Sequence, residues 1–134
     1  MNLTVDANIL FSALLKDSAT RSLILNRQLK LYAPRFLILE YAKYSAELRK
    51  RSGLGEKDFT EISKRIVRRI RLVSDGEIKP YYEAALGLVS DRKDAPYVAC
   101  ALAVGSELWS NDRHLKGIRV RNWTTKELVE KIFE

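Results

Sequence analysis

The stretch Leu3-Thr4-Val5-Asp6-Ala7-Asn8-Ile9-Leu10 decides the fold class of this chain. Its first three residues favour a β-strand that ends at Asp6, and the residues that follow are apolar at the spacing of a helix. Outward from this stretch, short strands continue to alternate with helices. Such alternation predicts an α/β fold with a largely parallel sheet and helices on both faces. The expected strands cover residues 3–5, 30–33, 71–73, 107–110 and 118–123, and the expected helices cover residues 7–15, 18–26, 35–51, 56–69, 80–89, 95–104 and 125–134.

Capping and helix-breaking residues set the expected boundaries. Asp17 or Ser18 is expected to cap the second helix, and Thr124 or Thr125 the last one. Glycines in the segment 52–55 separate the third helix from the fourth, and Gly105 ends the small-sided helix. Asp75-Gly76 is expected to form a turn.

The composition fits one domain over residues 1–134. Hydrophobic residues make up 46% of the chain and charged residues 31%, which is typical of a globular protein and not of a disordered one. Cys100, the single cysteine, lies in an apolar run and is expected to be a buried thiol, not a nucleophile. The N-terminus lacks a basic signal segment, and no apolar run approaches the ~20 residues that span a bilayer. We therefore expect a cytoplasmic protein with no membrane partner.

The net charge of +7 is concentrated in one part of the chain. Between Lys43 and Arg71 there are ten lysine and arginine residues and four acidic ones. A basic surface of this kind favours a polyanion such as RNA as partner, although two well-solvated helices would give the same composition. The candidates for nucleic-acid binding are Arg49, Lys50, Arg51, Arg65, Arg68, Arg69 and Arg113.

Two acidic residues fall at the carboxyl edge of the expected sheet, and two more lie near enough in the chain that all four could share one crevice. Asp6 follows the first strand, Asp112 follows the fourth, Asp94 precedes the small-sided helix and Glu40 lies early in the third helix. The carboxyl ends of parallel strands share one edge, where ligands bind. Clustered carboxylates with no histidine or cysteine favour the hard ions Mg²⁺ or Mn²⁺, which assist phosphodiester hydrolysis. Each acid alone has an ordinary alternative, as a cap, a turn residue or a solvated helix residue.

Three motifs in this order resemble those of PIN domains. They are residues 5–10, with an aspartate followed two residues later by Asn8; residues 91–96 with the alanines that follow; and residues 108–115, where Ser110 precedes the last aspartate by two. Trp109 stands where that family usually has an aliphatic residue, which affects local packing and not the acid. The resemblance covers almost the whole chain.

The resemblance implies a three-layer α/β/α sandwich with a short, mainly parallel sheet of four or five strands. It also implies a ribonuclease that depends on a divalent metal, with Asp6, Glu40, Asp94 and Asp112 as its acids. Asn8 and Ser110 would then orient the acids, and Asp91 is either a fifth acid or a helix-entry charge. Many PIN proteins of this length are toxins of the VapC type, commonly homodimers, each blocked by a small antitoxin.

Two other functions stay open at this point. A non-catalytic PIN-like module would bind RNA or a protein partner without needing metal. A phosphatase or phospho-receiver domain also places an aspartate after its first strand, but Asn8 stands where the haloacid-dehalogenase type of phosphatase would need a second one. His114, the only histidine, is expected on the surface or beside phosphate, and less as a general base, since a metal ion can activate water.

Overall fold

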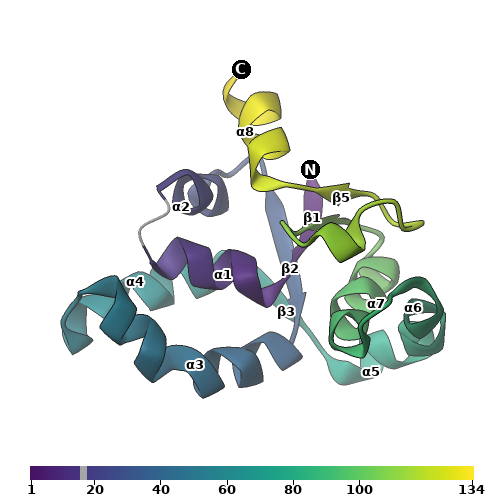
Figure 1. Cartoon of the computed structure of the whole chain (residues 1–134), viewed down its shortest axis with the longest axis horizontal. Helices are drawn as coiled ribbons and strands as arrows, with labels where there is room; N and C mark the ends of the chain where they lie inside the picture. Colours follow the sequence, from purple (N-terminus) through teal and green to yellow (C-terminus); the bar gives the residue numbers. More distant parts are fainter. Residues whose placement is uncertain (16–17) are drawn as a thin grey trace.

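A five-stranded parallel sheet in the order β3-β2-β1-β4-β5 forms the centre of the protein. The computed structural model describes residues 1–15 and 18–134, so the expected cap at Asp17 lies outside the described residues. All four strand pairings are parallel, and the expected α/β/α architecture is confirmed (Figure 1). The strands are β1 (Asn2–Val5), β2 (Lys30–Pro34), β3 (Ile70–Val73), β4 (Glu107–Trp109) and β5 (Asn122–Trp123).

Helices cover both faces of this sheet. One face packs against α1–α4 and α8, and the other packs against α5–α7 (Figure 1). Alternate residues of a strand point to opposite faces, so Leu3 and Val5 enter the first core while Thr4 faces Cys100 on the second. The helices are α1 (Ala7–Leu14), α2 (Ser18–Leu25), α3 (Phe36–Ser52), α4 (Glu56–Val67), α5 (Asp75–Ile78), α6 (Tyr82–Leu88), α7 (Ala95–Val104) and α8 (Thr125–Phe133), with 3₁₀ turns η1 (Lys79–Tyr81), η2 (Arg92–Asp94) and η3 (Arg113–Leu115).

Capping residues explain where several of these helices begin and end. The Thr124 hydroxyl accepts from the Glu127 N–H, and the Glu127 carboxylate accepts from the Thr124 N–H, which forms a capping box at the start of α8. Gly53 and Gly105 end α3 and α7 in the left-handed conformation, at φ 73° and 69°. The expected ends of these helices and the cap at Thr124 are confirmed.

Three sequence expectations for local structure are wrong. Asp75-Gly76 begins the short helix α5 instead of forming a turn, because the Ser74 hydroxyl caps it by accepting from the Glu77 N–H. The helix expected over residues 56–69 ends at Val67, and Ile70 pairs with Leu31 as the first residue of β3. The fifth strand is limited to residues 122–123, because β4 has only three residues and two of them pair with it.

Candidate active site

Asp6 connects the first strand to the first helix at the carboxyl edge of the sheet. Its Oδ1 accepts a hydrogen bond from the Ile9 N–H at 3.1 Å, so the side chain caps α1. Its own N–H donates to the Trp109 carbonyl of β4. Only 8% of Asp6 is exposed, which makes it a buried carboxylate at the floor of the site. Asp6 therefore caps a helix, as its ordinary alternative role would have it, and also lines the cavity described below.

Ser110 links Asp6 to Asp112. The fully buried Ser110 hydroxyl donates to Oδ2 of Asp6 and accepts from the Asp112 N–H at 3.0 Å. Asp112 then caps η3, where its Oδ1 accepts from the His114 N–H at 2.9 Å. These bonds fix the backbone after β4 against the backbone after β1. Ser110 therefore has contacts that suit a residue orienting both acids.

Asp94 and Asp91 approach from the other layer. Asp91 caps η2 by accepting from the Lys93 N–H at 3.0 Å, and Asp94 is the last residue of η2, directly before α7. Pro96 lies in the first turn of α7, where its missing N–H costs no helical hydrogen bond. Asp94 is half-buried, whereas Asp91 is exposed.

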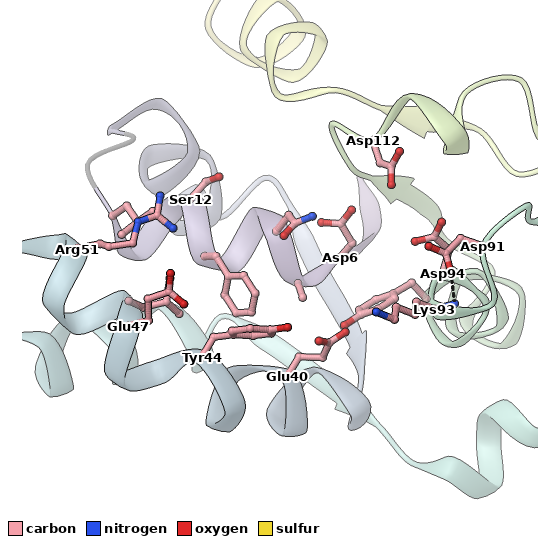
Figure 2. Close-up of a pocket in the computed structure, with 16 residues that line it drawn as sticks. Asp6, Ser12, Glu40, Tyr44, Glu47, Arg51, Asp91, Lys93, Asp94 and Asp112 are labelled. Carbon is pink, nitrogen blue, oxygen red and sulfur yellow. Dashed lines mark hydrogen bonds between the residues drawn. The ribbon is translucent and has the colours of Figure 1, made fainter.

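Glu40 brings the fourth carboxylate from α3, and one cavity of about 600 Å³ joins all four acids. Figure 2 shows Asp6, Glu40, Asp94 and Asp112 at one end of this cavity and Arg51 at the other. Asn8, on the exposed side of α1, also lines the cavity. The remaining lining includes Phe11 and Tyr44, whose rings meet edge to face with centroids 5.8 Å apart.

The acids act on one another electrostatically. The pKa of Asp6 is raised from 3.8 to about 6, first by burial and then by the nearby charges of Asp94 and Asp112, against the lowering effect of its hydrogen bonds to Ser110 and Ile9. Burial also raises the pKa of Asp94, as do the charges of Asp112 and Asp91. These carboxylates are therefore close enough to disfavour one another's ionised form, which is the electrostatic signature of a site that gains from a cation.

Sequence reasoning did not assign Tyr97 to this site and did not predict the contact of His114 with Asp112. Tyr97 of α7 lines the cavity, although an aromatic residue in an apolar helix indicates only a core position. His114 was expected on the surface, and 72% of its side chain is indeed exposed, but its Nδ1 lies 3.1 Å from Oδ1 of Asp112. The spacing of Asp112 and His114, two residues apart in a capped turn, is the only sequence signal for this contact.

The donors around the cavity suit a hydrated hard cation. Among residues 1–15 and 18–134, no three Asp, Glu, His or Cys side chains form a closed metal-binding group. Mg²⁺ usually keeps several waters and takes one or two carboxylates directly, so a closed shell is not required. The cavity offers carboxylate oxygens and the buried Tyr97 hydroxyl, which has no hydrogen-bond partner in the described part of the chain. This donor set fits Mg²⁺ or Mn²⁺ better than zinc.

Comparison with known families matches residues 4–132 to the model described as PIN domain. The chain belongs to the PIN domain family. The match covers nearly the whole chain, so the fold and the family suggested by the three sequence motifs are confirmed. No curated protein sequence matches this PIN domain.

Solved structures share the fold of this PIN domain at low sequence identity. A chain of the VapBC2 complex from Rickettsia felis, bound to a promoter DNA fragment, has a TM-score of 0.69 and 16% identity, covering 92% of this chain and 98% of that one. A chain of a toxin–antitoxin complex from Klebsiella pneumoniae has a TM-score of 0.68 and 13% identity, and the match covers 92% of this chain and 97% of that one. PAE2754 from Pyrobaculum aerophilum has a TM-score of 0.69 and 19% identity, and the match covers 98% of this chain and 88% of that one.

The basic residues of this PIN domain are spread over several surfaces. Arg51 lines the acidic cavity, and Arg113 follows Asp112 directly. Arg65 lies on the outer side of α4 beside Asp58 and Glu61. Arg49 and Lys50 are exposed in the last turn of α3. The clustering along the sequence therefore does not form a single patch around the acids.

Arg68 and Arg69 lie at the opposite, amino-terminal edge of β2 and β3. Arg69 has a role that the sequence did not indicate. Its guanidinium donates three hydrogen bonds, each 3.0 Å long, to the carbonyls of Ile24, Asn26 and Leu29. Because these donors hold the segment between α2 and β2, Arg69 has a structural role, and its expected part in nucleic-acid binding stays a prediction.

Two further expectations concern the rest of the chain. Cys100 is a fully buried free thiol whose pKa burial raises to about 11, as expected for a core residue and not a nucleophile. No helix in the described part of the chain has the length and apolar character needed to span a bilayer.

Proposed function

We propose that this PIN domain is a divalent-metal-dependent endoribonuclease that hydrolyses RNA phosphodiester bonds in the cytoplasm. The observation that carries the proposal is the meeting of Asp6, Glu40, Asp94 and Asp112 in one cavity, from elements far apart in the sequence. Burial and the charges of neighbouring carboxylates raise the pKa of Asp6 and of Asp94, and such a group at the carboxyl edge of a parallel sheet is a usual setting for Mg²⁺ or Mn²⁺.

Each acid has a distinct part in holding the ion. Asp6 is fixed by the Ser110 hydroxyl and the Ile9 N–H, so its carboxylate is held in place before any ion arrives. Asp112 is held by the Ser110 hydroxyl at its N–H, and Asp94 and Glu40 face it across the cavity (Figure 2). When bound, the ion would lower the pKa of a water and neutralise charge on the phosphate.

Basic residues would hold the RNA chain. Arg51 stands at the far end of the cavity from the acids, where a phosphate of the same strand could lie (Figure 2). Further candidates are Arg113, Arg49 and Lys50, because they are exposed cations near the site or on the same helix as Arg51. Arg65 and Arg68 lie away from the acids and would contribute only to a longer or structured RNA.

We further propose that the protein acts as the toxin of a toxin–antitoxin pair. Two of the structures with this fold are the VapBC2 complex from Rickettsia felis and a toxin–antitoxin complex from Klebsiella pneumoniae. The antitoxin would be a small protein with a basic side chain that enters the acidic cavity and pairs with its carboxylates. A homodimer is part of the same proposal.

Expression of the protein alone should arrest bacterial growth, and Asp112→Asn should relieve that arrest.

The decisive experiment is RNA cleavage with and without metal. Labelled RNAs and single-stranded DNAs of the same sequence are incubated with Mg²⁺, Mn²⁺ or EDTA. The wild type is compared with Asp112→Asn, which keeps an oxygen to cap η3, and with the matched control Asp58→Asn on the exposed side of α4. We expect RNA cleavage that requires metal, survives in Asp58→Asn and falls by about 100-fold or more in Asp112→Asn.

Two results would contradict the proposal. Cleavage that continues in EDTA, or that Asp112→Asn retains, would overturn the site. Salt-sensitive RNA binding with no cleavage under any condition would instead support the non-catalytic module, since phosphate contacts alone weaken steeply with salt.

A further inference from the structure

The Tyr97 hydroxyl is an unpartnered donor inside the acidic cavity. Tyr97 is 3% exposed, and its Oη has no hydrogen-bond partner among residues 1–15 and 18–134. Leaving a buried hydroxyl unpaired costs free energy, so nearly all buried polar groups in folded proteins are satisfied. A phenylalanine would fill the same space without that cost. We therefore expect the hydroxyl to gain a hydrogen-bond partner when a ligand occupies the cavity.

Packing fixes where this hydroxyl lies. Tyr97 reaches from α7 into the core that α1–α4 and α8 form on one face of the sheet. Val98 and its neighbours belong to the core on the other face, which α5–α7 cover. Its ring meets Phe36, the first residue of α3, edge to face with centroids 6.1 Å apart. Because Phe36 and α7 hold the ring, its Oη stays at the wall of the cavity and does not turn out to solvent.

Glu40 is the matching acceptor. It follows Phe36 by four residues on α3, so it lies one turn further along the same side of the helix. Its carboxylate makes no hydrogen bond or ion pair with any described residue. Burial raises the pKa of Tyr97, and the Glu40 charge is the strongest of the nearby charges that raise it further, so the phenol remains a donor.

We propose that Tyr97 is a positioning residue that donates a hydrogen bond to the Glu40 carboxylate and aims it at a divalent cation in the cavity. The proposal rests on the metal-dependent function proposed above. The pairing gives each group its missing partner: the Tyr97 donor is satisfied, and Glu40 is held with one oxygen free for the ion. Asp6 and Asp112 already have hydrogen-bond partners. Of the other two acids, Glu40 acts on the Tyr97 hydroxyl more strongly than Asp94 does, which makes Glu40 the acceptor.

The test replaces the hydroxyl and keeps the ring. Tyr97→Phe is compared with the wild type and with Tyr82→Phe, which removes a hydroxyl from a partly buried ring of α6 outside the cavity. Mn²⁺ binding is followed by electron paramagnetic resonance, and melting is followed with and without Mn²⁺. We expect Tyr97→Phe to weaken Mn²⁺ binding by about 10-fold or more, as is typical for partners of metal ligands. Its metal-free melting temperature should equal or exceed that of the wild type, because an unpaired buried hydroxyl is gone.

A double variant shows whether Tyr97 acts through Glu40. Glu40→Gln alone should weaken Mn²⁺ binding, and adding Tyr97→Phe to it should cause no further loss, because the two changes disable one interaction. Additive losses would place Tyr97 elsewhere and overturn the proposal. Unchanged Mn²⁺ affinity in Tyr97→Phe, or the same loss in Tyr82→Phe, would overturn it too.

RNA cleavage separates failure of this inference from failure of the proposed function. If the wild type cleaves RNA with metal, Tyr97→Phe should lower kcat at sub-saturating Mn²⁺, leave the KM for RNA unchanged and recover at high Mn²⁺. Wild-type cleavage with an unaffected Tyr97→Phe would refute the positioning role alone. A wild type that binds Mn²⁺ but cleaves nothing would refute the nuclease function, and the Mn²⁺ titrations would still decide the role of Tyr97.

Discussion

The buried charge of Asp6 should make the metal-free protein less stable at neutral pH than at mildly acidic pH. The folded protein holds the Asp6 proton up to about pH 6, whereas an ordinary aspartate releases it near 3.8. Between these values the folded state binds more protons than the unfolded state, so the free energy of unfolding falls as pH rises through this window. At about 1.4 kcal/mol for each pH unit, the full effect is about 3 kcal/mol above pH 6.

Asp6→Asn isolates this effect. Asparagine also caps helices well, so its side-chain oxygen replaces the bond to the Ile9 N–H, and Ser110 can accept from the new amide. We expect the variant to exceed the wild type in unfolding free energy by about 3 kcal/mol at pH 7, and by about 1 kcal/mol at pH 4.5.

Urea unfolding in EDTA measures the difference, with fluorescence of the buried Trp109 and Trp123 as the signal. For a urea slope of about 2 kcal/mol per M, the pH 7 midpoint should rise by roughly 1.5 M. Asp58→Asn, an exposed aspartate on α4, serves as the control and should follow the wild type across the pH range. Parallel pH dependences for Asp6→Asn and the wild type, or a less stable Asp6→Asn at pH 7, would refute the reasoning.

Three further substitutions test the contacts that hold the site. Ser110→Ala should lower the unfolding free energy by about 1–3 kcal/mol in a urea titration, because it leaves an Asp6 oxygen and the Asp112 N–H without a partner; an unchanged stability would show that these bonds are not formed. Arg69→Ala should cost about 3 kcal/mol, because three carbonyls lose their donor, while RNA cleavage per folded molecule stays at the wild-type level; a specific loss of RNA binding would contradict its structural role. Thr124→Ala should lower the free energy of unfolding by about 1 kcal/mol, because the α8 cap is lost; an unchanged free energy of unfolding would count against the capping box.

The sequence predicts the parallel sheet and places two of the four acids at one edge of it. Asp6 and Asp112 each follow a strand, and parallel strands place their carboxyl ends at one edge of the sheet. The strand pattern in the sequence is therefore enough to predict that these two acids lie close together. Glu40 and Asp94 lie in or beside helices, and their place in the cavity depends on how α3 and α7 pack, which the motif resemblance implied. The motif resemblance was confirmed by the family match over residues 4–132.

Side-chain reach across the fold is what the sequence could not reveal. Arg69 follows Arg68 in a basic run, and its bonds to a loop about 40 residues earlier appear only when α4 and β2 are placed. Tyr97 has the sequence signal of a core residue, and its unpaired hydroxyl is visible only in three dimensions. The extent of β5 was overestimated because alternation continues through Ile118, whereas the neighbouring β4 has only three residues for it to pair with.

The most direct test of the account uses sulfur substitution in the RNA. A single non-bridging oxygen at the cleaved phosphate is replaced by sulfur, and cleavage is compared in Mg²⁺ and in the more sulfur-tolerant Mn²⁺. If the carboxylates of the cavity hold an ion against that phosphate, cleavage of one sulfur diastereomer should fall by about 10-fold or more in Mg²⁺ and recover in Mn²⁺. An equal loss in both metals, or cleavage that needs neither, would contradict the claim that these acids act through a bound cation.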